Sequence, residues 1–219
     1  MPTVDQTKLR QSVIDGCRWM YARGLNQGTS GNISVRVEGG LLITPSGIPY
    51  DQMRPDMLRL VPLQGDPEVT GPLKPSTEWR FHQSVLRTRP DLMAVVHAHP
   101  AHATAVAMQR RAIPACHYMV AAFGGNDVPL VDYATFGSPE LAEWVSIAMQ
   151  NRTACLLANH GAVVAGETLD RALWRMEELE TLARGYILSM STGSPTILTD
   201  EQMDAVVLAF GDYGPRVAR

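Results

Sequence analysis

The chain has 219 residues, of which 45% are hydrophobic and 19% are charged, and its formal net charge at pH 7 is −3. This composition is typical of an ordinary globular protein, and the length predicts a single domain over residues 1–219. The slightly acidic balance and the absence of a basic run argue against nucleic acid as a partner.

Residues 5–23 predict an amphipathic helix, because Leu9, Val13, Cys17 and Met20 recur at helical spacing. This segment has no apolar core of the signal-peptide type, and no stretch of the chain is long enough to span a membrane. The three cysteines share no C-x-x-C spacing, which is typical of a reducing compartment. We therefore expect a cytoplasmic protein that does not contact a membrane.

Strand and helix patterns alternate through the rest of the chain. Residues 33–37 and 41–44 flank the pair Gly39-Gly40 and predict a hairpin. Further strands are expected over 57–61, 92–96, 154–158 and 162–165, and helices over 78–88, from 101, and over 138–151, 168–190 and 199–210. Hairpins mixed with helices favour an α/β fold, in which helices cover a sheet with substantial antiparallel pairing.

Three histidines follow apolar runs at expected strand ends. His97 and His99 lie just before Pro100, and side chains two residues apart on a strand share a face. His160 follows the second run at a turn, so three imidazoles would leave a position free on a catalytic zinc ion. The residues alone also allow ordinary histidines, one buried and one solvated. For His102, at an expected helix start, we favour a polar capping role.

Three loops combine small, polar and glycine residues in a way that is typical of anion sites: 28–32, 44–47 and 75–77. Glycine lets a ligand approach closely, and a helix start offers unpaired N–H groups. The alternative is that they are plain turns and caps. Glu78, which follows the third loop, could complement a helix dipole or act as a metal ligand or general base. No Walker or Rossmann pattern supports nucleotide binding.

Lysine usage argues against Schiff-base chemistry. Only Lys8 and Lys74 are present, one on the polar side of the first helix and one in a proline-rich loop. A Schiff-base lysine must be desolvated to lower its pKa, and neither position favours that. Carbonyl chemistry in this chain would therefore need a metal ion as the electron sink.

At this point the motifs resemble a known family, the class II aldolase and adducin-head family. The resemblance covers nearly the whole chain and rests on GNISVR (31–36), ITPSG (43–47), PSTE (75–78), HAHP (97–100) and NHG (159–161). Two further segments, IPACHYM (113–119) and YATFG (133–137), are most similar to its sugar-phosphate aldolases. The family fold is a three-layer αβα sandwich with a central, largely antiparallel sheet, and we expect it here.

The resemblance also implies a site. It implies one Zn²⁺ per subunit, with the metal ligands Glu78, His97, His99 and His160. Glu78 and Tyr118 would be the catalytic residues that transfer protons, and Tyr213 would close over the substrate. Phosphate would lie against a set of small and polar residues, namely Gly31, Asn32, Ser46, Gly47, Ser76 and Thr77. The sites would sit at subunit interfaces of a homotetramer, with Tyr118 reaching a neighbouring subunit.

The activity that the resemblance implies is cleavage of a ketose 1-phosphate, similar to L-fuculose 1-phosphate, into dihydroxyacetone phosphate and an aldehyde. Relatives catalyse other reactions at the same three histidines, so pentulose-phosphate 4-epimerase and methylthioribulose-phosphate aldolase or dehydratase remain alternatives. A different class of function is a non-catalytic, adducin-like binding module. The presence of all three histidines and Glu78 argues against that class.

Overall fold

A seven-stranded sheet forms the centre of the computed structural model, which describes residues 6–69 and 71–211. The strand order is β3-β2-β1-β4-β9-β8-β7, and all neighbours are antiparallel except β7 and β8. The strands are β1 (Asn32–Val37), β2 (Gly40–Ile43), β3 (Arg59–Pro62), β4 (Ala94–Ala98), β7 (Leu130–Val131), β8 (Ala154–Leu157) and β9 (Gly161–Gly166). The predicted hairpin is β1–β2, and the largely antiparallel sheet is confirmed.

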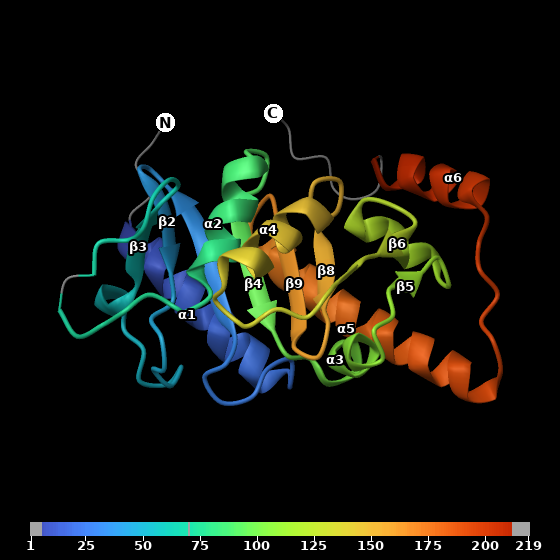
Figure 1. The fold of residues 1–219 in the computed structure, drawn as a ribbon, viewed down its shortest axis with the longest axis horizontal. Helices are drawn as coiled ribbons and strands as arrows, with labels where there is room; N and C mark the ends of the chain where they lie inside the picture. The colour runs from blue at the N-terminus through green and yellow to red at the C-terminus, as the bar shows by residue number, and fades with distance from the viewer. Residues whose placement is uncertain (1–5, 70, 212–219) are drawn as a thin grey trace.

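Helices cover both faces of this sheet (Figure 1). Helices α2 (Trp79–Thr88) and α4 (Pro139–Ala148) pack on one face. The other face is covered by α1 (Gln6–Ala22), α3 (Ala101–Met108) and α5 (Leu169–Thr192), with α6 (Asp200–Gly211) beyond them. None of the described helices is long and apolar enough to cross a membrane. The expected three-layer αβα sandwich is confirmed.

Alternation along the central strands explains why two helix layers are needed. In β4, Val96 packs into the core under α1, α3 and α5, whereas Val95 packs into the core under α2 and α4. In β9, Val164 and Val163 divide in the same way. Side chains two residues apart lie on one face of a strand, so a strand that is apolar at every position must be buried on both faces.

Some short elements were not predicted. The segments η1 (Pro55–Met57) and η2 (Tyr118–Phe123) are 3-10 helices, and β5 (Ile113–Pro114) pairs with β6 (Asp127–Val128) in a separate two-stranded sheet. A two-residue strand is too short for an alternating pattern to appear in the sequence. These elements form through tertiary contacts rather than through local periodicity.

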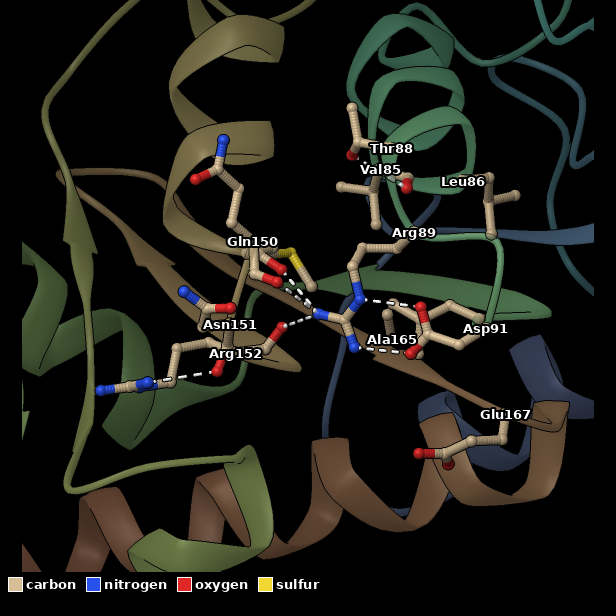
Figure 2. A network of polar contacts seen from close by, with 12 residues as sticks. Val85, Leu86, Thr88, Arg89, Asp91, Gln150, Asn151, Arg152, Ala165 and Glu167 are labelled. Atoms are coloured by element: carbon tan, nitrogen blue, oxygen red, sulfur yellow. Dashed lines mark hydrogen bonds and ion pairs between the residues drawn. The ribbon is translucent and has the colours of Figure 1, made fainter.

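The predicted helix over 138–151 ends earlier, at Ala148, and Arg89 binds carbonyl groups that follow it (Figure 2). The guanidinium of Arg89 donates hydrogen bonds to the carbonyl oxygens of Met149 (2.8 Å), Gln150 (3.2 Å) and Arg152 (3.0 Å). It also pairs with Asp91 through two bonds of 2.9 and 2.7 Å. A single side chain thus satisfies backbone acceptors that the end of a helix leaves free.

Candidate metal centre

Adjacent strands bring the three histidines together. In the register of the sheet, His97 of β4 lies beside Asn32 of β1 on one side and Val163 of β9 on the other. His99 follows β4 directly, and His160 directly precedes β9. One ligand nitrogen from each of the three rings lies within 4.8 Å of the others, so the predicted grouping is present.

His102 lies outside this group and has a different role. It sits in the first turn of α3, where its Nδ1 is 2.7 Å from Oε1 of Glu180. The Glu180 carboxylate also accepts the backbone N–H groups of His102 and Ala103. The predicted position at a helix start is confirmed, and the cap comes from a carboxylate on α5.

Hydrogen bonds at Nδ1 turn Nε2 of two rings toward the centre. His97 Nδ1 lies 2.9 Å from the carbonyl oxygen of Ala162. A carbonyl oxygen only accepts, so Nδ1 carries the hydrogen and Nε2 keeps its lone pair. His99 Nδ1 lies 3.1 Å from the hydroxyl of Ser30. The Nε2 atoms of His97 and His99 are buried and have no hydrogen-bond partner.

The loop that carries His160 depends on an unusual backbone. Asn159 adopts a positive φ of 55°, and Gly161 lies against the neighbouring strand end. A Cβ at Gly161 would stand 2.5 Å from Cδ2 of His99 and 2.6 Å from the carbonyl oxygen of Ala98. Only glycine allows the two histidine segments to approach this closely.

Burial keeps the imidazoles neutral. Desolvation lowers the pKa of His97 to about 3 and the pKa of His160 to about 4, and it also lowers the pKa of His99. Proximity of the rings to one another adds to the effect at His97 and His160. A neutral imidazole is the form that binds a metal ion, so a metal would not have to displace protons at neutral pH.

Glu78 completes the group of donor atoms. Its Oε2 lies 3.2 Å from Nε2 of His97, and its Oε1 lies 3.3 Å from Nε2 of His160. Asn32 Nδ2 donates to Oε2 at 2.8 Å, whereas the buried Oε1 has no hydrogen-bond partner. Burial raises the pKa of Glu78, although the nearby histidines and the bond from Asn32 act in the opposite direction.

These atoms fit a bound metal ion. Buried polar atoms without partners are rare and costly in folded proteins, yet three of them converge here: His97 Nε2, His99 Nε2 and Glu78 Oε1. Imidazole nitrogens with a carboxylate oxygen are a donor set that suits zinc and related divalent ions. A bound ion would give all three of these atoms a partner.

The three predicted anion loops meet at a cleft of about 420 Å³; Glu78, His99 and His160 line it as well, whereas the fully buried His97 does not. Every residue predicted to contact phosphate lines it, as does Phe136. The loops are joined by backbone bonds, because Ser46 N donates to Lys74 O and Ser76 N donates to Thr44 O. Those two N–H groups are therefore already paired, which leaves hydroxyl groups and other N–H groups for a ligand.

The cleft does not test the roles predicted for two tyrosines. Tyr118 begins η2 with half of its surface exposed, and it is not among the residues that line the cleft of its own chain. Tyr213 lies outside the described residues. The roles given to both remain predictions.

Buried polar residues that sequence reasoning missed support the site from behind. Asn26 Oδ1 accepts the backbone N–H of His99 at 3.2 Å, and Asn26 Nδ2 donates to the hydroxyl of Tyr50 at 2.9 Å. His82 lies 2.5 Å from Asn32 Oδ1. The spacing of His82, four residues after Glu78 on a predicted helix, was the available signal that both share a face.

Comparison with known proteins gives the class. The family model for the class II aldolase and adducin N-terminal domain matches residues 11–187. The chain therefore belongs to the class II aldolase and adducin family, whose aldolases are metal-dependent. The structure is similar to that of an L-fuculose 1-phosphate aldolase, with a TM-score of 0.89 and 35% identity, covering 95% of this chain and 100% of the other.

Individual relatives of the chain are named as sugar-phosphate aldolases. It is 45% identical to the L-fuculose phosphate aldolase of Escherichia coli (strain K12), over 98% of this chain and 99% of that protein. It is 46% identical to the 5-methylthioribulose-1-phosphate/5-deoxyribulose-1-phosphate aldolase of Rhodospirillum rubrum, over 94% of this chain and 92% of that protein. The chain is thus an enzyme of the class II aldolase type, a lyase.

Proposed function

We propose that this enzyme is a zinc-dependent aldolase that cleaves a ketose 1-phosphate, with L-fuculose 1-phosphate as the first candidate, into dihydroxyacetone phosphate and an aldehyde. The observation that carries this proposal is that two kinds of group meet at one cleft. Glu78, His99 and His160 line it, and so do three loops rich in hydroxyl groups and glycine. A phosphorylated sugar with an adjacent carbonyl group could contact both.

The histidines would hold the ion through Nε2 of His97, His99 and His160. When bound, a zinc ion would supply Lewis-acid chemistry, polarising the substrate carbonyl and stabilising negative charge on its oxygen. The protein fixes the tautomer of His97 through Ala162 and the position of the His99 ring through Ser30. Fixed ring orientations keep the lone pairs directed at one point before substrate binds.

Glu78 would move the proton at the substrate carbon. Its pKa is raised by burial, which brings the carboxyl closer to the range in which it can both give and take a proton near neutral pH. Its Oε1 has no hydrogen-bond partner in the protein and would be available for this purpose once the substrate displaces Glu78 from the ion. Asn32 Nδ2 holds the other oxygen and so fixes the direction of Oε1.

Tyr118 would serve the cleft of a neighbouring subunit in a homotetramer, where its hydroxyl would take the proton from the C4 hydroxyl of the sugar. Its absence from its own cleft and its exposure support this role. Tyr133 and Phe136 are also large and more than half exposed, which suits burial between subunits. Tyr213 would close over the same site. We propose a cytoplasmic location for the assembly, with no nucleic-acid or membrane partner.

The phosphate would lie against Gly31, Asn32, Ser46, Gly47, Ser76 and Thr77. Packing requires glycine at position 31, because a Cβ there would stand 2.9 Å from the carbonyl oxygen of His97 and 2.8 Å from Asn26. Ser76 Oγ accepts the N–H of Glu78 at 3.3 Å, which leaves its hydroxyl hydrogen free to donate to an anion. The site would thus tie phosphate binding to the segment that carries Glu78.

A second candidate is cleavage of 5-methylthioribulose 1-phosphate or 5-deoxyribulose 1-phosphate. The similarity to the Rhodospirillum rubrum aldolase is as high as that to the Escherichia coli enzyme. Phe136 adds an apolar side chain to the cleft lining, which suits the methyl or methylthio end of such sugars. Epimerase and dehydratase activity on the same kind of substrate remain the next alternatives.

Incubation of the metal-analysed protein with each of these ketose 1-phosphates tests the proposal. Dihydroxyacetone phosphate should be released, release should stop with a chelator, and zinc should restore it. The sugar with the largest kcat/KM identifies the aldehyde. Bound zinc without release of dihydroxyacetone phosphate from any of these sugars would contradict the aldolase assignment and favour epimerase or dehydratase chemistry.

A further inference from the structure

Glu78 and Asn32, which line the cleft, begin a row of buried polar side chains whose other members, His82 and Ser34, do not line it. Glu78 Oε2 accepts from Asn32 Nδ2 at 2.8 Å, Asn32 Oδ1 lies 2.5 Å from His82 Nε2, and His82 Nδ1 lies 2.8 Å from Ser34 Oγ. The exposed fractions are 4% for Glu78 and Asn32 and 0% for His82 and Ser34. The row therefore has no access to solvent beyond Asn32.

Local geometry explains how the four side chains meet. Asn32 and Ser34 are two residues apart on β1, so both project from one face of the strand. His82 lies one helical turn after Glu78, on the face of α2 that packs on the sheet. His82 thus bridges the alternate residues of β1, with one ring nitrogen on each.

The direction of every hydrogen bond in this row follows from its first member. A carboxylate only accepts, so the amide nitrogen of Asn32 faces Glu78 and its oxygen faces His82. An amide oxygen also only accepts, so His82 must carry a hydrogen on Nε2. Because burial holds the pKa of His82 well below its ordinary value, the ring is neutral, and its Nδ1 accepts from the hydroxyl of Ser34.

The amide of Asn32 would otherwise have two orientations. Rotated by half a turn, it would direct its oxygen at the carboxylate of Glu78, and the carboxylate would lose its donor. The N–H of His82 favours the first orientation because it can donate only to the oxygen. A phenylalanine or leucine could fill the space between α2 and β1 equally well, so packing alone does not call for a histidine here.

We propose that His82 is a positioning residue that acts through Asn32: its Nε2–H donates to the amide oxygen and so holds the amide nitrogen toward Glu78, which keeps its hydrogen-bond donor and the orientation of its carboxylate. This proposal rests on the proton-transfer role given to Glu78 in the proposed function. His82 itself does not line the cleft. It would therefore influence the reaction without touching the substrate.

Two matched variants separate this role from packing. The amide nitrogen of His82→Gln reaches the place of Nε2 and can still donate to Asn32, whereas the amide of His82→Asn reaches only the place of Nδ1. We expect His82→Asn to lower kcat by about 10-fold to 100-fold, the range typical of residues that orient a site from behind, with a smaller change in KM. His82→Gln should recover most of this loss, and both variants should bind zinc with unchanged stoichiometry.

The tautomer gives a readout that does not depend on activity. In protein labelled with ¹⁵N in the rings of its six histidines, the signal missing from His82→Gln identifies His82. We expect a neutral ring with its hydrogen on Nε2 at neutral pH. In Ser34→Ala the hydrogen should stay on Nε2, because the amide oxygen of Asn32 still needs a donor there.

Several outcomes would overturn the proposal. One is a hydrogen on Nδ1 of His82. Another is a kcat of His82→Asn equal to that of the unchanged protein, or a kcat lowered equally in His82→Asn and His82→Gln. The last is an increase in the KM of His82→Asn with no change in its kcat. If the unchanged protein cleaves none of the ketose 1-phosphates, the proposed function fails, and the tautomer still decides whether His82 holds the amide of Asn32. The two failures are therefore distinguishable.

Discussion

Acidification should destabilise the metal-free protein through its buried histidines. Desolvation lowers the pKa of His97 to about 3 and that of His160 to about 4, whereas an unfolded histidine titrates near its ordinary value of about 6.5. Between pH 4 and 6.5 the unfolded chain therefore binds more protons than the folded chain. Under that condition the free energy of unfolding rises with pH and falls on acidification.

The magnitude follows from these pKa values. At pH 5, protonation of the unfolded state lowers the free energy of unfolding by about 2 kcal/mol for each of His97 and His160, or about 4 kcal/mol together, relative to pH 7. His99 and His82, whose pKa values are also lowered by burial, act in the same direction. Glu78 acts in the opposite direction, because burial raises its pKa and the folded chain gains a proton there.

Urea unfolding of chelator-treated protein at pH 7 and pH 5 measures this effect. The Glu78→Gln variant removes the opposing contribution, so its loss of stability between the two pH values should be larger than that of the unchanged protein. The His160→Asn variant should lose about half of the dependence assigned to the pair. If the free energy of unfolding of Glu78→Gln is as high at pH 5 as at pH 7, or higher, the histidines are not held neutral by burial in the folded protein.

Three further substitutions test other parts of the structure. Glu78→Gln should lower kcat by about 10²-fold to 10⁴-fold with zinc still bound. Steady-state kinetics together with metal analysis measures this, and an unchanged kcat would contradict the role of Glu78. Gly161→Ala places a Cβ 2.5 Å from His99 Cδ2, so zinc binding measured by chelator competition should weaken at least about tenfold. Equal zinc affinity would contradict the close packing of Gly161 against His99. Arg89→Ala should lower the free energy of unfolding by about 2–4 kcal/mol while activity per folded molecule is retained, and Arg89→Lys should lower it less. A change of less than about 0.5 kcal/mol in Arg89→Ala would show that the hydrogen bonds of Arg89 do not stabilise the fold.

Much of the fold could be predicted from the sequence because it depends on local periodicity. Apolar residues at helical spacing located α1 and α5, and alternating residues around Gly39-Gly40 located the β1–β2 hairpin. The limits of the elements were less certain. α4 ends at Ala148, and the carbonyl groups beyond it bind Arg89, a residue about sixty positions earlier, which no pattern within the helix itself could indicate.

The site was predictable where ligand chemistry leaves a short motif. His97, His99 and His160 occupy strand ends, and loops 28–32, 44–47 and 75–77 line one cleft as expected. The positions of the histidines already pointed to a catalytic zinc ion, whereas only the resemblance to a family supplied the assignment of Tyr118. The position of Tyr118 outside its own cleft could be read only from the folded chain.

The sequence by itself determined which residues can bind a metal ion and an anion, because that capacity belongs to the side chains and to the turns that carry them. Only the tertiary structure decided how these residues are supported. The contacts of Asn26 with His99 and of His82 with Asn32 join segments far apart in the chain, and the sequence shows just the spacing of His82 from Glu78. Such contacts depend on the register of β1 against β4 and on the packing of α2, and both arise only when the sheet and its helix layers have formed.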